Sequence, residues 1–435
     1  MKHAGEITKM RALPRTNGRI FSRSLAAITL SALLLVMVPA QVFLAPAPPA
    51  QADQARALQY WLTGYGIQEA WKTTKGAGVV VAVIDSGVDK THPTLVDAVI
   101  GGKDFSGVGK PDGSGPVGTS PEHGTLVASI LGGRGEGGDN GLIGVAPEVS
   151  ILAVSVGFGL GNNVDQQIAD AIIWSVDQGA DIINLSLTRN SPDWPLSWDE
   201  AFRYAFEHDV LIVAAAGNRA SGTTMVGAPA TIPGVLTVAG VNEAKQASFD
   251  SSTQGVTIAV SAPSEQLVGA LPGGGYALWS GTSGAAPIVS GIAALILSAH
   301  PDASAAEIIA RLNSTATKVG DPLIYGNGLV NAEAAVTRSS VRPAAEPSAL
   351  LEDWIRIHRR ATPAEPGVPS TIEGPVLSPI EYEAISEPNF FQELFNPTNL
   401  RNEVIPLLVF SGFGLLLLTI LVFGALHFLR RRKQR

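Results

Sequence analysis

The stretch VVVAVID, residues 79–85, decides the fold class, because six apolar residues run without interruption into a carboxylate. A short, uniformly apolar run is typical of a strand that is buried on both faces of a parallel sheet. Four more apolar runs follow, at residues 151–156, 181–187, 210–216 and 235–241. Together the five runs predict a mostly parallel sheet.

Amphipathic helical patterns lie between several of these runs, at residues 165–180 and 198–209. In the first pattern, Ile168, Ile172 and Val176 share one stripe of the expected helix. Buried strands that alternate with helices predict a doubly wound α/β fold, in which helices flank both faces of the sheet. Folds of this kind carry their sites at the carboxyl ends of the strands.

Three polar residues lie at the ends of apolar or helical segments of the sequence. Asp85 ends the first apolar run, His123 opens the helical pattern HGTLVASILGG, and Ser283 lies among glycines in SGTSGAAPIV. Each has an ordinary structural explanation when it is taken alone. These are a turn aspartate, a histidine at a helix start and a serine that caps a helix.

Taken together, the same three residue types indicate acyl transfer. A serine hydroxyl needs an imidazole to accept its proton and a carboxylate to orient that imidazole. The helix start at Ser283 supplies a backbone N–H and the positive end of a helix dipole. Asn218, in AAAGN, offers a second donor to an oxyanion, with a turn asparagine as the alternative. Pro287 falls close to the first turn, where a missing N–H does least harm.

The motifs VAVIDSGVD, HGTLVAS, AAAGN and GTSGAAP resemble those of the subtilisin-like serine proteases, in the order Asp, His, Ser. The resemblance covers residues 71–336. It implies that Asp85 orients the imidazole, that His123 is the general base and acid, and that Ser283 is the nucleophile. It also implies that Asn218 and the Ser283 N–H form the oxyanion hole.

The resemblance further implies a site for an extended polypeptide substrate. NLSL looks like the family strand whose backbone pairs with the substrate. Thr188 stands where a glycine is common, and Gly284 and Ile288 stand where many members carry methionine and histidine. These departures concern the shape of the pocket. The expected substrate-binding residues are Asn184, Leu185, Ser186, Leu187 and Gly217.

Composition excludes several other classes of protein. The net charge of -8 over 435 residues provides no basic surface for nucleic acid. Cysteine is absent, which excludes disulfides, thiolate zinc sites and a cysteine nucleophile. The acidic loops show no spacing typical of a metal site, so we assign neither a metal nor a cofactor.

The N-terminal segment, residues 1–52, has the pattern of an export signal. Basic residues precede an apolar run at 25–45, and AQA at 50–52 fits the cleavage rule for signal peptidase. The alternative is an uncleaved signal anchor, because the run has about the 20-residue length of a spanning helix.

The C-terminal apolar segment, residues 405–429, is long enough to span a lipid bilayer and has no Asp, Glu, Lys or Arg. The basic tail at 430–435 is expected to stay in the cytoplasm, by the positive-inside rule. The peptidase domain, residues 53–338, is therefore expected to be extracytoplasmic and tethered to the cell membrane by this single span.

A proline-rich linker at 339–404 is expected to join the domain to the membrane. LLEDWIRIHRR, residues 350–360, is hypothesised to be a short amphipathic helix that docks on the protease body. FFQELF, residues 390–395, is hypothesised to lie in the membrane interface.

The export signal, the AW lead-in, the terminal span and the lack of room for a folded propeptide resemble the mycosins. These are membrane-anchored proteases associated with type VII secretion. The absence of cysteine departs from many mycosins, and an ordinary cell-surface subtilisin is the alternative. The function expected is a membrane-anchored serine endopeptidase. The rival hypothesis is a protease-fold scaffold in a secretion complex, in which catalysis is incidental.

Overall fold

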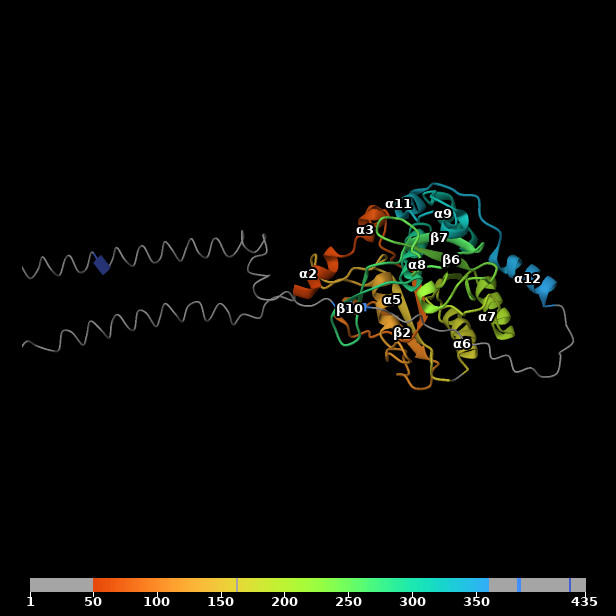
Figure 1. The fold of residues 1–435 in the computed structure, drawn as a ribbon, viewed down its shortest axis with the longest axis horizontal. Helices are drawn as coiled ribbons and strands as arrows, with labels where there is room; N and C mark the ends of the chain where they lie inside the picture. The colour runs from red at the N-terminus through yellow and green to blue at the C-terminus, as the bar shows by residue number, and fades with distance from the viewer. Residues whose placement is uncertain (1–49, 162, 360–381, 385–421, 424–435) are drawn as a thin grey trace, which may run out of the picture. The chain divides into compact units, whose positions relative to one another are not determined.

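The structure is a computed structural model that describes residues 50–161, 163–359, 382–384 and 422–423 (Figure 1). Of the predicted N-terminal signal, only residues 50–52 are described, at the start of a helix, and the predicted interface segment 390–395 lies outside the described residues. Of the predicted span at 405–429, only residues 422 and 423 are described.

The central sheet has seven strands in the order β2-β3-β1-β4-β5-β6-β7, and each neighbouring pair is parallel. Val83 of β1 faces Ala153 of β3 on one side and Asn184 of β4 on the other. The predicted apolar runs fall on β1 and β3 to β6, whereas β2 and β7 form the edges. The strands are β1 Val80–Asp85, β2 Val99–Asp104, β3 Ser150–Ser155, β4 Ile182–Leu185, β5 Leu211–Ala215, β6 Leu236–Val241 and β7 Ile258–Pro263.

The two faces of the sheet are covered by two separate hydrophobic cores. In β1, Val81 and Val83 belong to one core, and Ala82 and Ile84 belong to the other. This alternation follows from the two-residue period of a strand. The predicted doubly wound arrangement is therefore present (Figure 1). The first core is covered by α5 (His123–Gly132) and α8 (Thr282–Ala299), and the second by α6 (Val164–Asp177) and α7 (Leu196–Glu207).

A smaller antiparallel sheet, in the order β10-β9-β8, leads into α8. Other short helices contact β7, β9, α8 or one another. These elements are α2 Ala50–Ala57, α3 Trp61–Gly64, α4 Ile67–Ala70, β8 Leu267–Ala270, β9 Tyr276–Trp279, α9 Ala305–Thr315, α10 Pro322–Tyr325, α11 Ala332–Thr337 and β10 Tyr382–Ala384, with 3-10 turns at Pro93–Leu95 and Arg219–Ser221.

α8 is the central helix of the first core and runs against β4 to β7. Within the part of the chain that the structure describes, it is the one helix long and apolar enough to cross a membrane. However, 83% of its apolar window is buried inside the protein. Its hydrophobicity is therefore that of a core helix.

The helix hypothesised over 350–360 is present as α12 (Pro347–His358), which packs on α7 and is drawn in blue in Figure 1. Leu351 is fully buried in the second core. The Trp354 ring lies 4.2 Å from the Trp194 ring, between centroids. Beyond the helix, Arg359 donates to the Trp194 carbonyl at 2.8 Å and pairs with Asp199 at 3.0 Å. The helix docks on the protease body, as hypothesised.

Candidate active site

Asp85 and His123 meet at the carboxyl end of β1. Asp85 is the last residue of β1, and His123 is the first residue of α5. His123 Nδ1 lies 2.8 Å from Asp85 Oδ1 and 2.9 Å from Oδ2, and both side chains are fully buried. Since a carboxylate only accepts, Nδ1 carries the proton and Nε2 is left as the acceptor of a neutral ring.

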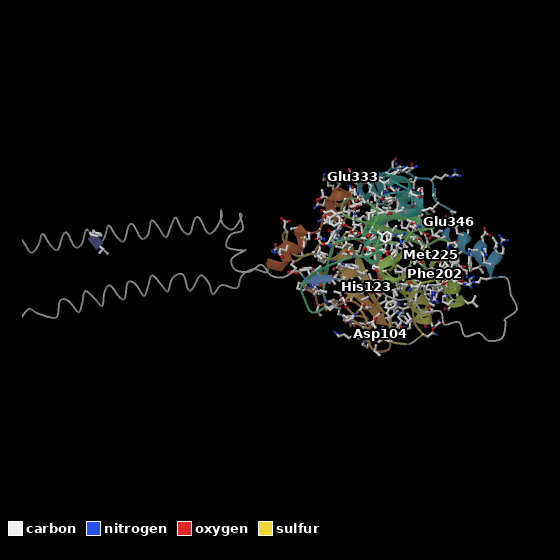
Figure 2. All side chains as sticks on the ribbon, in the orientation of Figure 1. Asp104, His123, Phe202, Met225, Glu333 and Glu346 are labelled. Atoms are coloured by element: carbon white, nitrogen blue, oxygen red, sulfur yellow. The ribbon has the colours of Figure 1, made fainter. Side chains whose placement is uncertain are left out.

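Figure 2 labels His123 within the protease body. Its Nε2 atom is buried and has no hydrogen-bond partner among the described residues. A buried acceptor without a partner is unusual in a folded protein. The ring therefore presents a proton-accepting atom that is available to an incoming hydroxyl.

Ser86 braces the Asp85–His123 pair. Its N–H donates to Asp85 Oδ1 at 2.7 Å, and its hydroxyl accepts from the Gly124 N–H at 2.9 Å. A Cβ atom on Gly124 would lie 2.2 Å from the Gly87 carbonyl oxygen, so the start of α5 approaches the β1 turn too closely for any other residue. Ser86, Gly87 and Gly124 lie within the motifs VAVIDSGVD and HGTLVAS, but the sequence did not show that they brace the pair.

Ser283 is the second residue of α8 and is nearly buried. Its hydroxyl donates to the Ser186 carbonyl at 3.2 Å. The hydrogen bond between nucleophile and base is thus not formed in this conformation, which is common before substrate binds. Its N–H belongs to the first turn, where amides have no acceptor within the helix.

Asn218 lies in the loop after β5 and is tied to the start of α8. Its Oδ1 accepts from both the N–H and the hydroxyl of Thr282, each at 2.8 Å. The same hydroxyl accepts from the Gly217 N–H at 3.1 Å. Gly281, at φ +150°, passes so close that a Cβ atom on it would lie 3.0 Å from Asn218 Nδ2. The loop therefore lies beside Ser283, and Thr282, which the sequence did not single out, connects the two.

Trp279 and Leu267 explain one departure from the family pattern. The edge of the Trp279 ring meets the His123 ring with centroids 5.9 Å apart. A Cβ atom on Gly284 would lie 2.3 Å from Leu267 Cδ1 and 3.3 Å from Trp279 Cζ2. Any larger side chain at position 284 would require Leu267 to move. The other departure, Ile288, is fully buried in the first core.

The structure separates the expected substrate-binding residues into two groups. Asn184 and Leu185 lie within β4, between β1 and β5, and both are fully buried. Ser186 and Leu187 follow the end of that strand, and Gly217 follows β5. Only the second group lies outside the sheet, and within it Ser186 contacts Ser283 and Gly217 contacts Thr282. No group of three potential metal ligands is found among the described residues.

The subtilase family model, Peptidase S8, matches residues 76–328. The chain belongs to the subtilase family. This subtilase is 39% identical to the Subtilisin of Bacillus pumilus over 263 residues, which are 60% of this chain and 91% of that protein. It is also 39% identical to Subtilisin E of Bacillus subtilis (strain 168) over 263 residues, where the match spans 66% of the relative's length. Its class is therefore that of a serine endopeptidase.

Solved structures similar to this subtilase include proteases of secretion systems. MycP1 with its N-terminal propeptide removed is 30% identical, with a TM-score of 0.57 over 66% of this chain and 99% of MycP1. The MycP3 protease from the type VII (ESX-3) secretion system is 30% identical, with a TM-score of 0.55 over 68% of this chain and 90% of MycP3. The neighbours thus include mycosins, as the sequence resemblance indicates.

Proposed function

We propose that this subtilase is a membrane-anchored, extracytoplasmic endopeptidase that uses Asp85, His123 and Ser283 to cleave polypeptides. The observation that carries the proposal is the buried hydrogen bond from His123 Nδ1 to Asp85, which leaves Nε2 as an acceptor with no partner among the described residues. A general base for a serine nucleophile requires this arrangement.

The reaction begins when the Ser283 hydroxyl leaves the Ser186 carbonyl and turns toward His123 Nε2. The ring takes the proton as Oγ attacks the peptide carbonyl carbon, and Asp85 stabilises the imidazolium that forms. His123 then gives the proton to the leaving amine. Water, activated by the same ring, hydrolyses the acyl-enzyme and releases Ser283.

The oxyanion of the tetrahedral intermediate needs donors that are fixed before the reaction. We assign them to the Ser283 N–H, at the positive end of α8, and to the Asn218 side-chain amide. Because Thr282 donates twice to Asn218 Oδ1, the amide is oriented with its nitrogen toward Gly281. The loop and the helix start thereby act as one unit.

We assign the substrate backbone to the chain that leaves β4 at Ser186 and Leu187, together with Gly217 in the loop after β5. An extended peptide that pairs with a strand is bound mainly through its main chain. Sequence specificity then depends on side-chain pockets around Ser283. The two buried residues of the motif, Asn184 and Leu185, support this strand from inside the sheet.

The test is hydrolysis of a diverse peptide mixture by the purified protein and by Ser283→Ala. We expect loss of at least about 10⁴-fold in kcat, since the nucleophile of such a site acts as a unit with its base. Thermal unfolding should show that the variant is folded. Hydrolysis by folded Ser283→Ala at a rate near that of the wild type would refute the assignment.

A second function, a scaffold within a secretion complex, is favoured by the likeness to the MycP3 protease of a type VII secretion system. A deletion strain complemented with Ser283→Ala separates the two. If the fold acts as a scaffold, secretion is restored by the inactive variant. If proteolysis is the function, secretion stays defective although the variant is present at normal abundance.

A further inference from the structure

The nucleophile lies four residues before a proline in the same helix. In an α-helix, the carbonyl of one residue accepts from the N–H four residues later. For Ser283 that residue is Pro287, which has no N–H and lies inside α8, beyond the first turn near which the sequence predicts it, so its missing N–H does remove a helical bond. The Ser283 carbonyl therefore lacks its helical donor. A buried carbonyl left without any donor destabilises the fold.

Ser186 replaces the missing donor from outside the helix. Its hydroxyl donates to the Ser283 carbonyl at 2.8 Å, and its own carbonyl accepts from the Ser283 hydroxyl at 3.2 Å. Two hydrogen bonds of opposite direction thus join these residues. The first acts on the backbone that carries the nucleophile, and the second acts on the nucleophilic oxygen itself.

Asn184 and Ser290 complete this contact. Asn184 Nδ2 donates to the Ser186 hydroxyl at 2.9 Å, and Ser290 donates to Asn184 Oδ1 at 2.9 Å. All three side chains are fully buried. The direction of each bond is fixed, because the Ser283 carbonyl can only accept and Ser186 has a single proton to give. Since Ser290 lies about two turns further along α8, the strand holds the helix at two points.

We propose that Ser186 and Asn184 are positioning residues for Ser283. They replace the helical hydrogen bond that Pro287 removes, and they hold the nucleophile's backbone at the distance from His123 that proton transfer requires. The inference rests on the proposed role of Ser283 as the nucleophile. Their side chains do not touch the reacting atoms, so their loss should lower kcat more than it raises KM.

The test compares Ser186→Ala with a matched control, Ser175→Ala, in the full chain. Ser175 is also buried, and its hydroxyl donates to the Ala171 carbonyl at 2.7 Å in α6, away from the site. We expect Ser186→Ala to lower kcat by about 10- to 100-fold, as expected for a nucleophile displaced by up to about 1 Å, with KM nearly unchanged. Ser175→Ala should leave both constants within about twofold of the wild type.

The decisive variant is Pro287→Ala in the Ser186→Ala background. Alanine restores an N–H at position 287, so α8 can satisfy the Ser283 carbonyl from within. We expect the double variant to recover at least about tenfold of the lost kcat, which corresponds to about 1.4 kcal/mol. If Ser186 only stabilised the fold in general, Pro287→Ala would not restore the lost kcat. If Ser186→Ala does not fold, Ser186→Cys, which keeps a similar volume but donates weakly, replaces it in both comparisons.

Two results would overturn the inference. One is a kcat for Ser186→Ala within twofold of the wild type, and the other is a kcat loss that Pro287→Ala leaves unrelieved. Neither of these two results depends on the outcome for Ser283→Ala. An inactive Ser283→Ala with a fully active Ser186→Ala defeats only the positioning role, whereas an active Ser283→Ala defeats the proposed function itself.

Discussion

At the scale of single residues, the carboxylate of Asp85 is buried, and burial of a charge is costly unless hydrogen bonds compensate for it. His123 and the Ser86 N–H provide those bonds. The motifs identify Asp85, His123 and Ser283, because each stands at a recognisable change of pattern. The contact between Ser186 and Ser283 could not be predicted, since it depends on how β4 and α8 pack. The one feature of the sequence that bears on this contact is Pro287, because it lacks the N–H that the Ser283 carbonyl would otherwise accept from.

His92 provides a prediction about pH. It is buried, its Nδ1 accepts from the Thr94 N–H at 3.1 Å, and its Nε2–H donates to the Gly275 carbonyl at 3.0 Å. Burial lowers the pKa of His92 below its usual 6.5, although hydrogen bonding to Gly275 and the nearby charges of Glu136 and Asp89 oppose this. A proton on Nδ1 would also remove the acceptor for Thr94.

Because the pKa of His92 is lower in the folded than in the unfolded protein, the unfolded state takes up its proton first. His92 therefore contributes stability at neutral pH that is lost as the pH falls below about 6.5. We expect the free energy of unfolding to drop less between about pH 7.5 and 5.5 in His92→Asn than in the wild type. Urea titrations at both pH values measure this, and an unchanged pH dependence would contradict it.

At the scale of elements, the interior strands were predictable and the edge strands were not. β1 and β3 to β6 are continuous apolar runs because both of their faces are buried. β2, with the sequence VIGGKD, is only half-buried along its length, and β7 ends in SAP. Edge strands tolerate glycine, charge and proline, so they lack the pattern that identifies a buried strand.

α12 lies beyond residues 76–328, which the family model matches, and it packs on the protease body. Leu351 is fully buried against the second core, whereas its neighbour Leu350 is exposed. We expect Leu351→Ala to destabilise the docked helix by about 2–5 kcal/mol, and Leu350→Ala to have an effect within about 0.5 kcal/mol. Hydrogen exchange over residues 347–359 should rise in the first variant only. Equal exchange in both variants would show that the helix is not held by this contact.

At the scale of the whole molecule, the sheet brings the site together at its centre. The strand order reverses around β1, with β2 and β3 on one side and β4 to β7 on the other. A crevice forms at such a reversal, beyond the carboxyl ends of the strands. Asp85 ends β1 at this point, and the chain after β4 and β5 brings Ser186 and Asn218 to the start of α8. The predicted fold class thus directs attention to this end of the strands, where the candidate site lies.

The proposed membrane anchor makes a prediction for the whole chain. Deletion of residues 405–435 should remove the proposed membrane span and release active protease from the membrane fraction. The deletion leaves the described body at 50–359 intact, so hydrolysis per molecule should stay within about twofold of the full chain. Fractionation followed by a peptidase assay measures both quantities. Retention of the truncated protein in the membrane would contradict anchoring by this segment.

The most direct measurement of the central claim is covalent labelling of the nucleophile by a sulfonyl fluoride, followed by mass spectrometry. We expect a single adduct on Ser283 of the native protein, with labelling strongly slowed in His123→Ala because the hydroxyl then has no base. An adduct on another residue, or equally fast labelling of Ser283 in His123→Ala, would contradict a nucleophile activated by the Asp85–His123 pair.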